Sequence, residues 1–71
     1  FEAVSSVIGR ASIGRGARLI ESTVWDGVEV GAGAELRGCI AAAGRIPAGV
    51  SHRDALLWGR AGEDAAVYPL G

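Results

Sequence analysis

A unit of about seventeen residues occurs three times along this chain, at positions 7–19, 24–36 and 40–50. Within each unit a branched aliphatic residue returns about every six positions. An amphipathic helix places its apolar residues three or four apart, and a half-buried strand alternates them at every second position. The period fits neither element, and favours a short unit that stacks on copies of itself. The repeating aliphatic residues are Val7, Ile13, Leu19, Val24, Val30, Leu36, Ile40 and Ile46.

A small residue lies two positions before most of these aliphatic residues. A large aliphatic residue with a small neighbour every six positions is the hexapeptide repeat. It predicts an all-β fold, a parallel β-helix of about three to four triangular coils over residues 1–58. Each coil has three short strands, tight corners and one inward aliphatic side chain per strand. The small residues are Ser5, Ala11, Ala17, Ser22, Ala34, Gly38 and Gly44, and Val28 is the large exception.

Glycines recur where the repeat places its corners, because a tight corner needs a positive φ or a close backbone approach. The Gly-x-Gly pairs at 14–16 and 31–33 occur once per coil, whereas a phosphate-binding loop would occur once in a chain. We therefore interpret these glycines as corner residues. The predicted corner glycines are Gly9, Gly14, Gly16, Gly27, Gly31, Gly33 and Gly49.

Charge and composition argue against several classes of partner. The net charge is −1, and the seven basic residues are interleaved with acidic ones rather than clustered, so no nucleic-acid partner is expected. No apolar run approaches the length of a membrane span. Cys39 is the single cysteine, which rules out an intramolecular disulfide and favours a cytoplasmic location. The absence of methionine indicates that the chain is a piece of a longer protein.

Residues 4–58 resemble the C-terminal left-handed β-helix of sugar-nucleotide pyrophosphorylases, in particular mannose-1-phosphate guanylyltransferases and glucose-1-phosphate nucleotidyltransferases. The hexapeptide pattern carries the resemblance to the fold, and the Val-Trp-Asp-Gly phrase at 24–27 points to this class of enzyme. The matching segments are 5–10, 13–17, 22–34, 39–40 and 46–49.

The resemblance implies a left-handed winding and a role without catalysis. In that family an N-terminal domain binds a nucleoside triphosphate and Mg²⁺ and transfers the nucleotidyl group to a sugar 1-phosphate, with release of pyrophosphate. No catalytic, cofactor-binding or metal-binding residue is therefore expected in this chain itself. Its expected partners are the missing catalytic domain and further copies in a homo-oligomer, with a possible part in regulation.

Two alternative functions remain open at this stage. Hexapeptide acyltransferases use the same prism with a catalytic histidine, and His52 is the only candidate here. Aligned on the repeat, however, His52 takes the inward position of Leu19 and Leu36, which favours a polar residue that ends the stack. The other alternative is a solenoid that serves only as a scaffold.

One column of residues predicts an interface. The residue after the first aliphatic of each coil is expected to point outward, and these residues are apolar. With Trp58, they form an apolar strip that would pack on a partner, unless the C-terminal tail folds back over it. The predicted interface residues are Ile8, Trp25, Ala41, Leu57 and Trp58.

Residues 59–71 break the repeat and are expected to form an irregular tail. The acidic residues show no spacing typical of metal ligands, so corner and surface positions are expected for them. Cys39 is interpreted as a small packing residue rather than a nucleophile. The acidic residues considered are Asp26, Asp54, Glu63 and Asp64.

Overall fold

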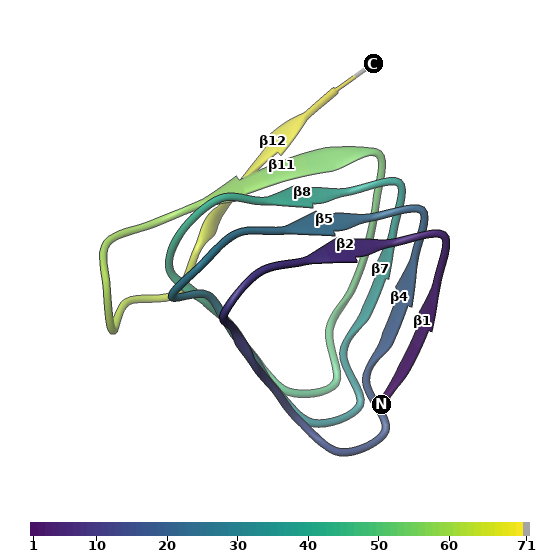
Figure 1. Cartoon of the computed structure of the whole chain (residues 1–71). Helices are drawn as coiled ribbons and strands as arrows, with labels where there is room; N and C mark the ends of the chain where they lie inside the picture. The colour runs from purple at the N-terminus through teal and green to yellow at the C-terminus, as the bar shows by residue number, and fades with distance from the viewer. Residues whose placement is uncertain (71) are drawn as a thin grey trace.

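In the computed structural model, which describes residues 1–70, the chain winds through about four turns of a parallel β-solenoid. Three sheets form the sides of a triangular prism, and each of the first three turns contributes one short strand to each side (Figure 1). The predicted all-β parallel β-helix is confirmed.

The strands of each side lie in register, one coil apart. Sheet A contains β1 (Glu2–Val4), β4 (Arg18–Ile20), β7 (Glu35–Arg37) and β10 (Ser51–Arg53). Sheet B contains β2 (Val7–Ile8), β5 (Thr23–Val24), β8 (Ile40–Ala41), β11 (Ala55–Trp58) and β12 (Ala66–Pro69). Sheet C contains β3 (Ser12–Ile13), β6 (Glu29–Val30) and β9 (Arg45–Ile46).

The core is a set of side-chain columns that run along the prism axis. Leu19 pairs with Leu36 in sheet A, and Val30 pairs with Ile46 in sheet C, as the repeat predicts. Buried small residues lie two positions before three of these four, and Val28 lies two positions before Val30. Burial of this apolar surface stabilises the fold at about 25 cal/mol per Å². The buried apolar residues are Ala17, Leu19, Val24, Val28, Val30, Ala34, Leu36, Cys39, Ala41, Ile46, Ala55 and Leu57.

Sheet B differs from the prediction by one residue in three of its coils. Val7 and Ile40 were expected to point inward, but Ile8 and Ala41 take these positions beside Val24. The predicted outward orientation of Ile8, Ala41 and Leu57 is therefore wrong: Ile8 packs against the core, and Ala41 and Leu57 are 0% and 1% exposed.

The cause is the corner between sheets B and C. Inward residues are six positions apart between Val24 and Val30, but only five between Ile8 and Ile13 and between Ala41 and Ile46. The alignment of aliphatic residues applied the six-residue spacing to all three coils, and so placed two inward positions one residue early. The corner between sheets A and B also spans five positions, from Leu19 to Val24, and a residue with positive φ makes this turn in every coil. The positive-φ residues are Ser5, Glu21, Gly38 and Asp54.

A ladder of small polar side chains lines this corner. The Ser22 amide donates a hydrogen bond to Ser6 Oγ, and the Cys39 amide donates one to Ser22 Oγ, each at 3.2 Å. The Ser22 hydroxyl lies 2.9 Å from the Ile20 carbonyl oxygen and 3.1 Å from that of Leu36. Cys39 Sγ donates to the Arg37 carbonyl at 3.4 Å. The buried corner amides thus have partners, and the cysteine lies in the column as a small packing residue.

Replacing Ser22 with alanine is expected to destabilise the protein by about 1–2 kcal/mol, because the inward Cys39 amide loses its acceptor in a dry interior. Urea unfolding monitored by tryptophan fluorescence measures the change. Ser12→Ala is the matched control, since Ser12 is exposed on β3. Equal stability of the two variants would contradict the role assigned to the Ser22 hydroxyl.

The C-terminal tail caps the last coil instead of remaining irregular. Residues 66–69 form β12, antiparallel to β11, with Leu56 opposite Tyr68. Asp64 forms a bridge to Arg45 at the end of sheet C. The expected irregular tail is wrong for this segment, because an apolar stretch can pair with the open edge that a last coil leaves. Gly71 lies outside the described residues.

The capping strand also protects its own free edge. The Leu70 amide donates to the Asp54 carbonyl at 2.9 Å, so alternate amides of the tail face β11. This alternation turns the backbone nitrogens of Val67 and Pro69 toward the free side. Proline has no N–H, so the free edge offers few donors to another strand.

Candidate functional site

The structure places the histidine on β10 and the acidic residues considered above at corners and in the tail. Within residues 1–70, no group of three or more His, Cys, Asp or Glu side chains could hold a metal ion. His52 is half-buried on β10 opposite Leu36, the inward position that the repeat predicted for it. Asp26 Oδ1 accepts a hydrogen bond from the Arg10 amide at 2.6 Å, and Asp64 pairs with Arg45 at 3.2 Å. These polar side chains serve the corners and the cap.

The glycine pairs support neighbouring coils rather than a ligand. Gly16 and Gly33 have φ values of 75° and 72°, as the tight corner requires. Gly31 lies so close to the next coil that a Cβ there would be 2.7 Å from the Ala48 Cα. The same arrangement holds one coil earlier at Gly14, where a Cβ would be 2.7 Å from the Ala32 Cα. The interpretation as corner glycines is confirmed for these residues.

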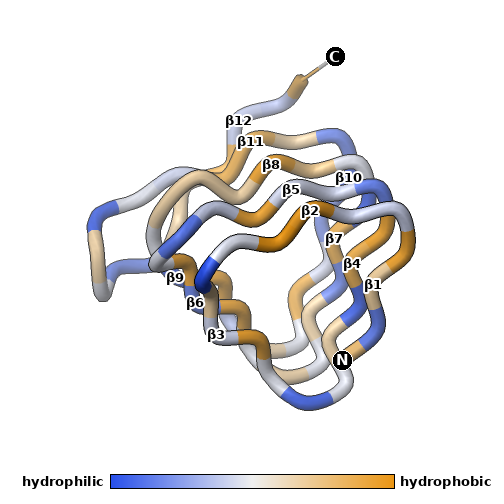
Figure 2. The backbone as a smooth tube through the Cα atoms, viewed as in Figure 1, coloured by the Kyte–Doolittle hydropathy of each residue, from blue (hydrophilic) through white to orange (hydrophobic). Residues whose placement is uncertain are grey.

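The outer surfaces of the three sheets differ in charge. Arginine side chains form ion pairs with glutamates along sheet A and with Asp64 at the end of sheet C. The outward positions of sheet B carry no charged side chain. Figure 2 shows the hydrophilic bands along β4, β7 and β10, and paler or hydrophobic colours along β2, β8 and β11. One side of the prism is therefore suited to contact with an apolar surface.

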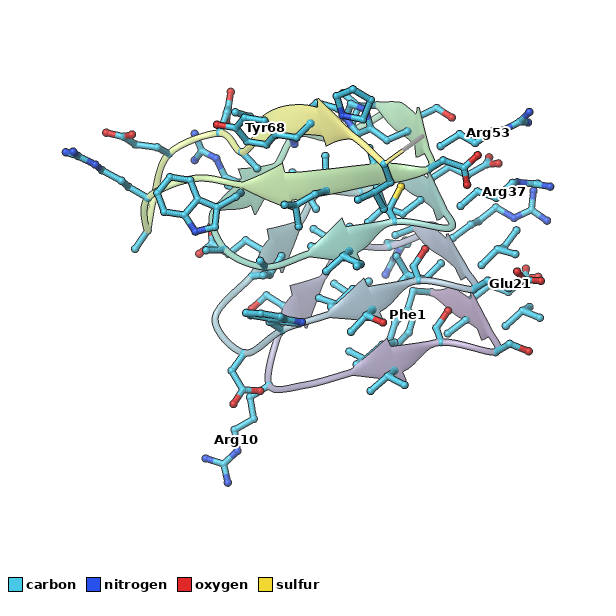
Figure 3. The ribbon with its side chains drawn as sticks, turned by 90° about the horizontal axis from the view of Figure 1, so that it is seen from above. Phe1, Arg10, Glu21, Arg37, Arg53 and Tyr68 are labelled. Atoms are coloured by element: carbon cyan, nitrogen blue, oxygen red, sulfur yellow. The ribbon has the colours of Figure 1, made fainter. Side chains whose placement is uncertain are left out.

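Two columns of side chains make up this surface, which we call the sheet B face. In one column, Val7 and Tyr68 occupy the two ends and are 69% and 49% exposed. In the other, Trp25 and Trp58 are 55% and 51% exposed. Figure 3 looks onto the sheet, with Tyr68 on its last strand and Arg37 and Arg53 beyond its side. The columns are Val7, Thr23, Ile40, Leu56 and Tyr68, and Gly9, Trp25, Ala42, Trp58 and Ala66.

The structure retains two of the five predicted interface residues on this face. Trp25 and Trp58 are exposed there, whereas Ile8, Ala41 and Leu57 point into the core. Four further apolar members of the face were not predicted from the sequence. The small residues Ser6, Ser22, Cys39 and Ala55 lie two positions before the inward residues of sheet B, so their alignment would have given the correct register. The missed members are Val7, Ile40, Leu56 and Tyr68.

The tail leaves the sheet B face open. Strand β12 extends the sheet at its edge and does not lie over Trp25. Trp25 stands between Gly9 and Ala42, and a shallow depression lies beside it, lined also by Val7 and Asp26. An apolar face of this kind, with two tryptophans and an adjacent depression, can hold a complementary protein surface.

Comparison with protein-family models, curated proteins and solved structures finds no match for this chain. Among the described residues there is no helix of the length and hydropathy needed to cross a membrane.

Proposed function

We propose that this chain is an assembly module without a catalytic centre, which docks on a protein partner through the sheet B face. The observation that carries the proposal is the contrast between the three sides of the prism. The face exposes a valine on β2, tryptophans next to β5 and on β11, and a tyrosine on β12, and the strands of this sheet carry no charged side chain. Exposed apolar patches of this kind mark interaction surfaces in soluble proteins.

We further propose that the module is the left-handed β-helix of a cytoplasmic sugar-1-phosphate nucleotidyltransferase of the mannose-1-phosphate guanylyltransferase type. The hexapeptide repeat, the glycine corners and the Val-Trp-Asp-Gly phrase support this proposal. Trp25 of that phrase lies on the sheet B face. Mg²⁺ and the nucleotide would belong to a catalytic domain elsewhere in the longer protein, and the module's role would be domain packing, oligomerisation and regulation.

The test uses the complete product of the reading frame that contains this chain. We expect it to release pyrophosphate from a nucleoside triphosphate when a sugar 1-phosphate and Mg²⁺ are present. The 71-residue chain alone is expected to release none. Further coils in place of a nucleotide-binding domain, together with acyl transfer from an acyl-CoA, would instead make the protein an acyltransferase.

The docking role has its own measurement in the complete product. Trp25→Glu places a charge on the sheet B face and is expected to lower the protein's mass in solution or loosen its domains. Glu29→Gln on sheet C is the control, since it alters a charge on another side of the prism. Unchanged mass and unchanged domain packing in the Trp25 variant would contradict the docking role.

A further inference from the structure

The two ends of the prism are closed to different extents. At the C-terminal end, β12 lies beyond β11 (Figure 1), and the inward side chain of Leu57 is buried. At the N-terminal end, no strand within residues 1–70 pairs with the outer edges of β1, β2 and β3. The inward residues Ile8 and Ile13 are only half-buried there, whereas their equivalents in the second coil, Val24 and Val30, are buried. The first coil therefore presents an open end of the core and three free strand edges.

Hydrogen bonds to the second coil show which backbone groups are free at this open end. The Glu2 amide donates to the Ala17 carbonyl at 2.9 Å, and the Glu21 amide donates to the Val4 carbonyl at 2.8 Å. Because alternate residues of a strand face opposite neighbours, the N–H and C=O of Ala3 point away from the second coil. The same alternation applies on the other two sides of the prism. The residues whose N–H groups point to the open end are Ala3, Ile8 and Ile13.

The tail completes the fourth coil before it forms the capping strand. The Arg45 amide donates to the Glu63 carbonyl, and the Ala65 amide donates to the Arg45 carbonyl, each at 2.8 Å. Asp64 forms a parallel bridge with Arg45, and Ala65 packs against the core. Residues 63–65 thus take the place of a fourth strand in sheet C. Only β12 departs from the repeat, because it runs antiparallel to β11.

Without β12 the two ends of the prism would be complementary. The last segments on the three sides would be β10, β11 and residues 63–65. The first strands, β1, β2 and β3, lie on the same three sides and run in the same direction. Since each coil is a copy of one unit, the first coil of a second molecule fits on the fourth coil of the first molecule as a fifth coil would.

We propose that β12 is an inhibitory segment that prevents head-to-tail assembly of this chain. It occupies the edge of β11 with which β2 of a second copy would otherwise pair. The inference concerns the ends of the prism, so it does not rest on the docking role of the sheet B face. A head-to-tail contact leaves both outer ends free for further copies, and therefore builds an open filament. Pro69 suits an inhibitory strand, because it removes a donor from the free edge of β12.

The test frees the edge of β11 in the 71-residue chain without shortening the chain. The Tyr68 amide faces β11, as the Leu70 amide does, because alternate amides of β12 face the same side. Tyr68→Pro removes this donor and is expected to release β12. Sedimentation velocity is expected to show a mean mass at least about tenfold higher than that of the unchanged chain at the same concentration. Fibre diffraction of the product is expected to give a spacing of about 4.8 Å along the filament axis.

Two further proline variants serve as controls. Val67→Pro is the matched control, because the Val67 nitrogen faces the free side of β12 and its N–H is not needed for pairing with β11. This variant is expected to form no filaments. Ala3→Pro removes a donor at the open end without the loss of a hydrogen bond to the second coil. Added to Tyr68→Pro, it is expected to abolish the filaments.

Far-ultraviolet circular dichroism at low concentration confirms that each variant folds. A chain that ends at Ala65 frees the same edge if Tyr68→Pro does not fold, and it too is expected to form filaments. The proposal is overturned if both of these chains keep the mass of the unchanged chain. It is also overturned if Val67→Pro forms filaments equally well, or if filaments persist after Ala3→Pro, because the contact would then not join the two ends of the prism.

Discussion

Replacing Leu36 with alanine is expected to destabilise the protein by about 3–5 kcal/mol, the largest effect of any single truncation proposed for this chain. Leu36 is fully buried at the centre of sheet A, between Leu19 on one coil and His52 on the next. Backbone pairing on both sides holds the coils in register, so the structure cannot collapse into the cavity that the substitution leaves. The loss of unfolding free energy then has two parts, the apolar burial that is lost and the cavity that remains unfilled.

A domain of about this size has only about 4–10 kcal/mol of total stability, so Leu36→Ala removes much of it. Urea and thermal unfolding monitored by circular dichroism measure the loss, which corresponds to a melting temperature lower by about 15 °C or more. Ile20→Ala is the matched control, because Ile20 is a similar aliphatic residue that points outward on the neighbouring strand β4. It is expected to cost about 1 kcal/mol or less. Equal losses in the two variants would contradict the inward assignment of Leu36.

The repeat predicts sheets A and C correctly because the inward residues of their central strands are large aliphatic residues. Ile13, Val30 and Ile46 mark one column, and Leu19 and Leu36 mark another, so hydrophobicity alone identifies the inward positions. In sheet B the alternation of inward and outward residues cannot be recognised from hydrophobicity. Residues on both surfaces of its strands are apolar, and hydrophobicity cannot tell which of Ile40 and Ala41 is buried.

The same ambiguity explains the error in the candidate site. A sheet with the core on one surface and an exposed apolar face on the other has apolar residues at successive positions, without polar residues between them. The predicted interface therefore shifted by one residue at Ile8, Ala41 and Leu57, while Trp25 and Trp58 remained on the correct side. The size of a tryptophan decides its side, because the narrow prism has no room for it. The position of β12 could not be predicted, because its pairing depends on the open edge that the last coil presents.

Gly31→Ala is expected to destabilise the protein by about 3 kcal/mol, at the upper end of what one added methyl group costs in a packed site. The added Cβ would lie 2.7 Å from the Ala48 Cα and from the Pro47 carbonyl carbon. Both atoms belong to the backbone of the next coil, so the contact is relieved only if the coils separate. Pro47 takes the corresponding position directly after β9, the last strand of sheet C, where no further strand of that sheet lies above it.

Gly33 provides the matched comparison two residues away, because its constraint is the backbone angle and not space. Its φ is 72°, and no atom would lie within 4 Å of an added Cβ. Gly33→Ala is therefore expected to cost only about 1–2 kcal/mol, and Gly33→Asn less, because asparagine tolerates the left-handed region. At Gly31 we expect the opposite order, with asparagine more destabilising than alanine. Asparagine is the larger residue, and its side chain would clash with the same backbone atoms of the next coil. Urea unfolding of the four variants tests this reversal, and the same preference for asparagine at both positions would show that the close approach of the coils at Gly31 is not what requires glycine there.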